Sequence, residues 1–227
     1  MKLFFVMLLL FPILCNAKLI VHVPILPGLF ETDGSGKFDK MLKNIDNTVD
    51  MDWKLNYTPF FRAVTLFKNS TSDCIIIGNK KLSKQHFKID AIDAGVPYNF
   101  VKLAFYTLND SSLISHTGDL KDKTIVHLTG ESPLEFGFSD ENTVFLGVNT
   151  HQQSIKMLEL NRAQSILGTT SSLYAYKDQL KYDPNFIVFK TMETLTCKDT
   201  KKTRKALEKF KEGLILIDHD VNDTLIW

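Results

Sequence analysis

Short apolar runs alternate with amphipathic segments along most of the chain. In the first half, β-branched apolar runs that fit strands alternate with segments whose apolar residues recur every three or four positions, which is the spacing of a helix. Such alternation indicates an α/β unit with a largely parallel sheet. The pattern predicts strands over 19–23, 49–55 and 73–78, and helices over 37–45 and 59–68.

A second series of the same kind begins near residue 113. Two units of similar element order suggest two lobes, and a pair of lobes that face each other can enclose a small molecule by hinge closure. A terminal amphipathic helix turns Ala206, Leu207 and Phe210 inward. The predicted strands are 123–128, 143–148, 163–168 and 186–189, and the predicted helices are 152–160, 171–180 and 201–211.

The first 17 residues have the layout of a secretory signal peptide. Lys2 precedes an unbroken apolar run over 3–15, and Cys15-Asn16-Ala17 is a small-residue processing site. The run is shorter than the roughly 20 residues that a membrane-spanning helix needs. We therefore predict that residues 1–17 are cleaved and that the mature chain is periplasmic or otherwise secreted, with an uncleaved anchor or a buried strand as the alternative.

Charge and motif content exclude several classes of function. The net charge is +1 at pH 7, and removal of residues 1–17, whose one charge is Lys2, lowers it to 0. A neutral chain has no general attraction for nucleic acid, so we expect no such partner. No nucleotide-binding loop, zincin motif or nucleophile elbow occurs, and the His residues lack ligand spacing. We expect no cofactor, no metal site and no catalytic residue.

Two cysteines, Cys74 and Cys197, remain in the predicted mature chain. An exported pair can form a disulfide. Cys74 lies in an apolar strand, where a buried free thiol is equally reasonable. Because the sequence does not give the distance between the two residues, both interpretations stay open.

Several short motifs resemble, in their order along the chain, those of one family. They are the loop Asp33-Gly34-Ser35-Gly36, the pair Arg62-Ala63 followed by Asp73, the turn Val96-Pro97-Tyr98, and Gly118-Asp119-Leu120-Lys121 before a strand. They resemble the motifs of the periplasmic solute-binding proteins of ABC importers. Within these proteins, the resemblance is to family 3, which has the type II architecture and includes the polar amino acid receptors. The similarity extends over essentially the whole mature chain.

The resemblance implies a two-lobed α/β fold. Each lobe would be a mostly parallel sheet flanked by helices, and two crossover strands would join the lobes. Lobe 1 would be discontinuous, with residues 18–106 plus 193–227, and lobe 2 would be residues 107–192. The implied function is that of a solute-binding protein, not an enzyme, which closes on a small polar or anionic ligand. The resemblance further implies a monomer that works outside the cytoplasm and serves ABC-type amino acid import with a membrane permease.

Two positions depart from the family pattern. Amino acid receptors hold the ligand carboxylate with an Arg shortly after the third strand, and here residues 78–86 contain none. Thr169 stands where those receptors carry an Asp for the ligand ammonium. Two alternatives therefore stay open: a dehydratase-like enzyme on the same fold, for which Glu131 is the carboxylate we nominate, and an orphan receptor for sensing or interaction.

The candidate ligand contacts lie mostly at the carboxyl ends of predicted strands, where open α/β sheets bind ligands. The turn after residue 128 offers free amide N–H groups to an anionic ligand group, or it caps the helix that follows. The two aromatic candidates have ordinary packing as the alternative. The full set is Phe30, Tyr57, Asn79, Lys80, Thr129, Gly130, Ser132, Thr169 and Thr170.

Overall fold

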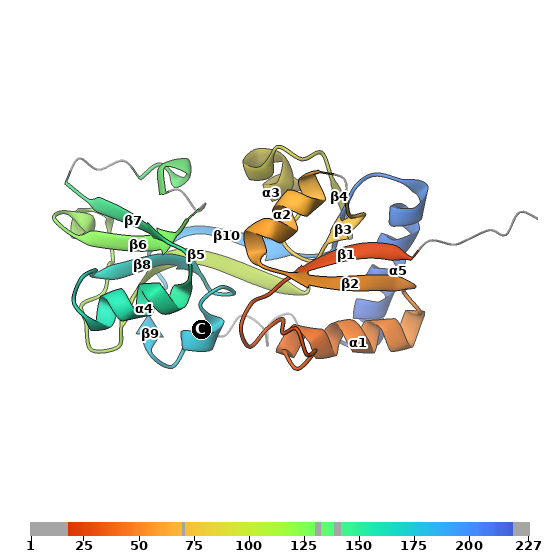
Figure 1. Ribbon diagram of the computed structural model, residues 1–227, viewed down its shortest axis with the longest axis horizontal. Helices are drawn as coiled ribbons and strands as arrows, with labels where there is room; N and C mark the ends of the chain where they lie inside the picture. Colours follow the sequence, from red (N-terminus) through yellow and green to blue (C-terminus); the bar gives the residue numbers. More distant parts are fainter. Residues whose placement is uncertain (1–17, 70, 130–132, 139–141, 220–227) are drawn as a thin grey trace, which may run out of the picture.

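Two β-sheets form two lobes that lie side by side along the long axis of the molecule (Figure 1). This computed structural model describes residues 18–69, 71–129, 133–138 and 142–219. The first sheet has the strand order β2-β1-β3-β11-β4, and the second has the order β10-β5-β8-β6-β7. The predicted two-lobed α/β architecture is confirmed, whereas the predicted signal peptide lies outside the described residues.

The first lobe is built on three parallel strands, β2, β1 and β3, with the antiparallel β11 next to β3. The helices α1 and α5 pack against one face of this sheet and α2 against the other. The helices α1 and α5 lie close because Gly213 faces Ile45, where a Cβ atom would meet the Ile45 side chain at 2.7 Å. The elements are β1 (Leu19–Pro24), α1 (Lys37–Val49), β2 (Trp53–Thr58), α2 (Phe60–Lys68), β3 (Cys74–Ile75), α3 (Lys80–Leu82), the π-helical turn η1 (Ser83–Phe87), β4 (Ile92–Asp93), β11 (Thr196–Cys197) and α5 (Lys201–Leu216).

The second lobe also has three parallel strands, β7, β6 and β8, which the antiparallel β5 and β10 extend. Side chains of β5 alternate between two cores: Leu103 and Phe105 enter one, and Ala104 and Tyr106 enter the other. The elements are β5 (Asn99–Leu108), η2 (Thr117–Leu120), β6 (Thr124–Leu128), η3 (Pro133–Phe136), β7 (Val144–Val148), α4 (His151–Glu159), β8 (Ser165–Thr169), η4 (Tyr174–Tyr176), β9 (Leu180–Lys181) and β10 (Ile187–Glu193).

The antiparallel strands β5 and β10 cross from one lobe to the other (Figure 1). Their pairing runs to Asn99 and Glu193, next to the first lobe. Beyond it, the backbone N–H of Thr194 donates to the carbonyl of Gly78 at 2.9 Å and the N–H of Tyr98 donates to the carbonyl of Glu193 at 3.0 Å. These are the two crossover strands that the family resemblance implied.

Three predicted elements differ in position, pairing or type, and β10 and α5 also extend beyond their predicted ends, to Glu193 and Leu216. The second strand begins at Trp53 and not near residue 49, because α1 continues to Val49 and ends at Asp50 in the left-handed conformation. The predicted strand over 73–78 pairs only at Cys74–Ile75. The predicted helix over 171–180 is one 3₁₀ turn, because the Thr169 and Ser172 hydroxyls bond to each other and to nearby backbone and so compete with helical bonding.

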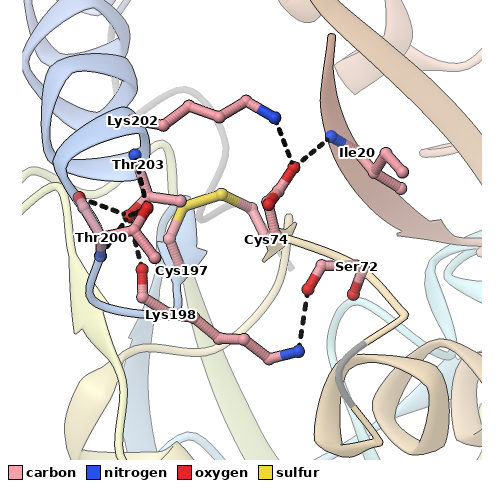
Figure 2. The surroundings of a disulfide bond; sticks show 9 residues. Ile20, Ser72, Cys74, Cys197, Lys198, Thr200, Lys202 and Thr203 are labelled. Atoms are coloured by element: carbon pink, nitrogen blue, oxygen red, sulfur yellow. Dashed lines mark hydrogen bonds and ion pairs between the residues drawn. A yellow bond between two sulfur atoms is a disulfide. The ribbon is translucent and has the colours of Figure 1, made fainter. Parts of the chain in front are cut away.

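A disulfide joins Cys74 of β3 to Cys197 of β11, and the two residues lie directly opposite each other in the antiparallel pairing (Figure 2). This decides between the two interpretations of these cysteines. Beside the disulfide, the Asp73 carboxylate accepts hydrogen bonds from the Ile20 backbone N–H at 2.8 Å and from the Lys202 ammonium at 2.9 Å. The disulfide and this ion pair hold the C-terminal segment against the centre of the first sheet.

Candidate ligand site between the lobes

A small cavity lies where the two lobes meet. Its walls come from the first lobe, after β1 and β3 and at the start of α2, and from the second lobe, along β5 and β10 and after β8. Its volume is about 70 Å³ and most of its wall is apolar, with Leu26, Phe60, Ile77 and Phe189 among the lining side chains. Hydroxyl groups of Ser171 and of neighbouring residues line the side that faces the second lobe.

Glu193 is the ionisable residue of this cavity. The residue is 7% exposed, and its Oε2 atom accepts hydrogen bonds from the Asn99 amide at 2.7 Å and from the Ser171 hydroxyl at 3.2 Å. Burial raises the pKa of this carboxyl to about 7, and these two hydrogen bonds act in the opposite direction. The group therefore exchanges a proton near neutral pH.

A second, wider cavity adjoins the first. It has a volume of about 420 Å³ and shares three lining residues with the smaller cavity, namely Leu82, Phe189 and Thr191. Three lysines line it, Lys80, Lys81 and Lys190, together with the single carboxylate of Asp93. The excess of positive charge in this cavity suits an anionic group of a ligand. The smaller cavity has the opposite character, because its one ionisable group is a carboxyl.

Asn79 and Lys80, two of the predicted ligand contacts, lie at the second cavity. The Asn79 amide nitrogen donates to the Thr191 hydroxyl and to the Met192 carbonyl, both at 2.8 Å, and its oxygen accepts from the Leu82 N–H at 3.0 Å. Asn79 therefore ties α3 to β10, because its amide nitrogen donates two hydrogen bonds and its amide oxygen accepts one. Lys80 is exposed and leaves its ammonium group available.

The two predicted threonines lie on the side of the second lobe. Thr169 lines the smaller cavity, and its hydroxyl donates to the Ser172 hydroxyl at 2.9 Å. The Thr170 hydroxyl accepts a hydrogen bond from the Lys102 backbone N–H at 3.2 Å and so supports β5. Thr169 and Glu193 thus line the same cavity, whereas Thr170 is not among the residues that line either cavity.

The two aromatic candidates belong to the first lobe, where Phe30 is buried and Tyr57 is half-buried. Phe30 is fully buried, with its ring centroid 5.4 Å from that of Phe38. The Tyr57 hydroxyl donates to the Asp39 carboxylate at 2.7 Å, and burial together with that carboxylate raises the pKa of Tyr57 well above its ordinary value. Neither residue is among those that line the two cavities. In this conformation Phe30 packs in the core and Tyr57 is hydrogen-bonded to Asp39, and their role as ligand contacts stays a prediction.

The candidate turn after β6 lies mostly outside the described residues, since Gly130, Glu131 and Ser132 are among those left out. Thr129 is exposed, and its backbone N–H donates to the carbonyl of Val148 at 2.7 Å. Thr129 is not among the residues that line either cavity, and the role of the turn stays a prediction.

Sequence reasoning missed Glu193 itself. Glu193 stands at the end of an apolar strand pattern, in the sequence Met192-Glu193-Thr194-Leu195. The one available signal was a carboxylate among apolar and hydroxyl residues. Its partner Asn99 is 94 positions away, so the pairing depends on the crossover of the two strands. Phe60 and Phe189 carried no signal beyond their helix and strand patterns.

Within the described residues, no group of His, Cys, Asp and Glu is arranged to hold a metal ion. The helices of the described part of the chain are all too short or too polar to cross a bilayer. Neither observation alters the picture of a cavity between two lobes.

Solved structures with the same architecture are numerous. The GluR0 ligand-binding core from Nostoc punctiforme, in complex with L-glutamate, superimposes with a TM-score of 0.68 at 16% identity, over 91% of this chain and 95% of that one. The chain has the two-lobed fold of these binding proteins. An arginine-bound ArgBP variant from T. maritima gives a TM-score of 0.64 at 15% identity, over 88% of this chain and 95% of that one.

A third example is a putative L-cystine ABC transporter protein from Listeria monocytogenes, with a TM-score of 0.63 at 17% identity over 88% of this chain and 89% of that one. No model of a protein family matches the chain, and no curated protein sequence matches it either. The likeness therefore concerns the fold, and the predicted solute-binding architecture rests on shape and not on sequence identity.

Proposed function

We propose that this protein is a solute receptor that closes its two lobes over a small polar ligand. In this proposal lobe 1 consists of residues 18–106 plus 193–227 and lobe 2 of residues 107–192. The observation that carries the proposal is the cavity walled by both lobes, with the carboxyl of Glu193 buried at its side. A ligand held there contacts both lobes at once, so its binding energy favours the closed arrangement.

The fold supports the same proposal, because its neighbours include a glutamate-bound ligand-binding core and an arginine-bound binding protein. We extend it to a monomer that works outside the cytoplasm and delivers its ligand to a membrane permease. The disulfide supports an extracytoplasmic location, since disulfides persist mainly in oxidising compartments. The enzyme alternative rested on Glu131, which lies outside the described residues.

The test uses the full mature chain, exported and purified with its disulfide intact. Ligand carried through purification is released by denaturation and identified by mass spectrometry, and the refolded, ligand-free chain serves as the matched control. Adding the identified molecule back is expected to raise the melting temperature and to lower the radius of gyration in X-ray scattering. Conversion of that molecule into a product would establish an enzyme instead, and binding without a change in lobe arrangement would contradict the receptor.

A further inference from the structure

Among the residues that the structure describes, the carboxyl of Glu193 has no positively charged partner. No Lys, Arg or His lines the smaller cavity, and among the described residues no ion pair involves this side chain. Both of its hydrogen bonds reach Oε2, so that Oε1 receives none from the described residues. An ionised carboxylate that is 7% exposed and lacks a counter-ion is unfavourable, and a cation in the cavity would remove that penalty.

The apolar lining of the cavity suits the body of an organic cation. Three aromatic rings line the same cavity, those of Phe60, Phe87 and Phe189. A ring face attracts an ammonium group and the carbon atoms next to it. A small inorganic cation would instead need several oxygen ligands, whereas this cavity has one carboxyl group and a mostly apolar lining.

We propose that the cavity between the lobes binds the ammonium group of an amine, which donates to Glu193 Oε1 while its first carbon atoms lie against the three phenylalanine rings. This deepens the proposed function and rests on it. The cavity of about 70 Å³ holds roughly two groups the size of a water molecule, hence the ammonium and its first carbon. The rest of the ligand extends into the adjoining cavity past Leu82 and Phe189, which both cavities share.

The titration of Glu193 supports this assignment. Burial raises its pKa to about 7, so the empty site is close to half protonated at neutral pH, whereas an amine needs the ionised form. The titratable group that faces it is Tyr98, whose buried phenol donates to the Ile76 carbonyl and whose pKa lies well above its ordinary value. Asn99 and Ser171, from the other packed elements, are neutral. Glu193 is thus the group that sets the pH dependence.

The experiment compares three probes with unbranched alkyl chains and different polar ends: n-butylamine, n-butanol and butyrate. Calorimetry on the ligand-free chain is expected to give binding of butylamine that is at least tenfold tighter than that of the other two. Glu193→Gln keeps the size of the side chain and is expected to lose at least tenfold in butylamine affinity. Glu208→Gln removes the same charge from an exposed position on α5 and is expected to change nothing. Equal affinity in wild type and Glu193→Gln would overturn the proposal.

A pH series on the wild-type chain tests the same point without a substitution. Butylamine affinity is expected to rise about tenfold from pH 6 to pH 8 as the carboxyl ionises, because the amine itself stays charged over this range. A flat profile would contradict the assignment. If butyrate closes the lobes and butylamine does not, the amine proposal fails and the receptor stands; if scattering finds no closure with any molecule, both fail.

Discussion

The two lobes share a core of three parallel strands but are consolidated differently. In the first, a large hydrophobic core joins the sheet to α1 and α5, a smaller one joins it to α2, and the disulfide and the Asp73–Lys202 ion pair fix β11. In the second, two smaller cores flank the sheet, and its edge strand β7 leaves Val144 52% and Leu146 38% exposed. The first lobe is therefore the more firmly held of the two, and the second is the one that unfolds more easily.

The largest expected effect comes from removing the disulfide. The double substitution Cys74→Ala and Cys197→Ala is expected to lower the free energy of unfolding by about 4 kcal/mol, because the bond closes a loop between residues 123 positions apart. Urea unfolding followed by circular dichroism measures the loss. Reduction of the wild-type chain serves as a second route and should give a similar value. A loss below about 1 kcal/mol by both routes would remove the main difference between the lobes.

The second largest effect is expected from a matched pair of substitutions in the two cores, Leu42→Ala in the first lobe and Leu167→Ala in the second. Both side chains are buried, so each substitution is expected to cost about 3 kcal/mol. In a Trp227→Phe background, fluorescence of Trp53 reports on the first lobe and circular dichroism on both. Leu167→Ala is expected to separate the two transitions, with ellipticity lost first. Coincident transitions would mean that the lobes unfold as one unit despite their different construction.

Acid is expected to loosen the second lobe through His151. Burial at the start of α4 lowers the pKa of His151 to about 4, and its two ring nitrogens have no hydrogen-bond partner among the described residues. Since the folded pKa lies below the ordinary value of about 6.5, the stabilisation is present above pH 6.5 and is lost as the pH falls toward 4. Between pH 7 and pH 5 we expect a loss of about 2 kcal/mol.

The variant His151→Gln should remove most of this acid sensitivity, as measured by urea unfolding at several pH values. His116→Gln, at an exposed position, is the control and should keep the wild-type profile. An unchanged profile in His151→Gln would place the acid-sensitive group elsewhere.

The smallest effects are expected at two matching helix N-caps, one in each lobe. Thr200 accepts a hydrogen bond from the Thr203 N–H at 3.1 Å at the start of α5, and Thr150 accepts one from the Gln153 N–H at 3.2 Å at the start of α4. Replacing either with Ala is expected to cost about 1 kcal/mol. Hydrogen exchange should register the Thr150→Ala loss in the second lobe alone. If each substitution instead increased hydrogen exchange equally in both lobes, the lobes would not be separate units of stability.

The fold was largely predictable because its amphipathic helices and apolar strands carry local patterns. The α1 face of Phe38, Met41, Leu42 and Ile45 is buried as its spacing predicted. The segment after β8 was not predictable in this way, since the Thr169 and Ser172 hydroxyls redirect the backbone hydrogen bonds. The disulfide remained open because no local pattern encodes a distance across 123 positions.

The candidate site was less predictable than the fold. Asn79, Lys80 and Thr169 follow strand ends, and the structure has them at the two cavities because strand ends gather at one edge of a sheet. Glu193 lies instead on a crossover strand, and its environment comes from Asn99 and Ser171 of two other segments. The chemistry of the site therefore depends on packing that spacing along the chain does not reveal.

The Cys74–Cys197 bond also makes the whole second lobe a closed covalent loop. A protease that nicks an exposed strand such as β7 would leave two polypeptides that migrate as one until a reductant is added. A single cut in the second lobe would then not release it from the first, which would matter in the extracytoplasmic location that we propose.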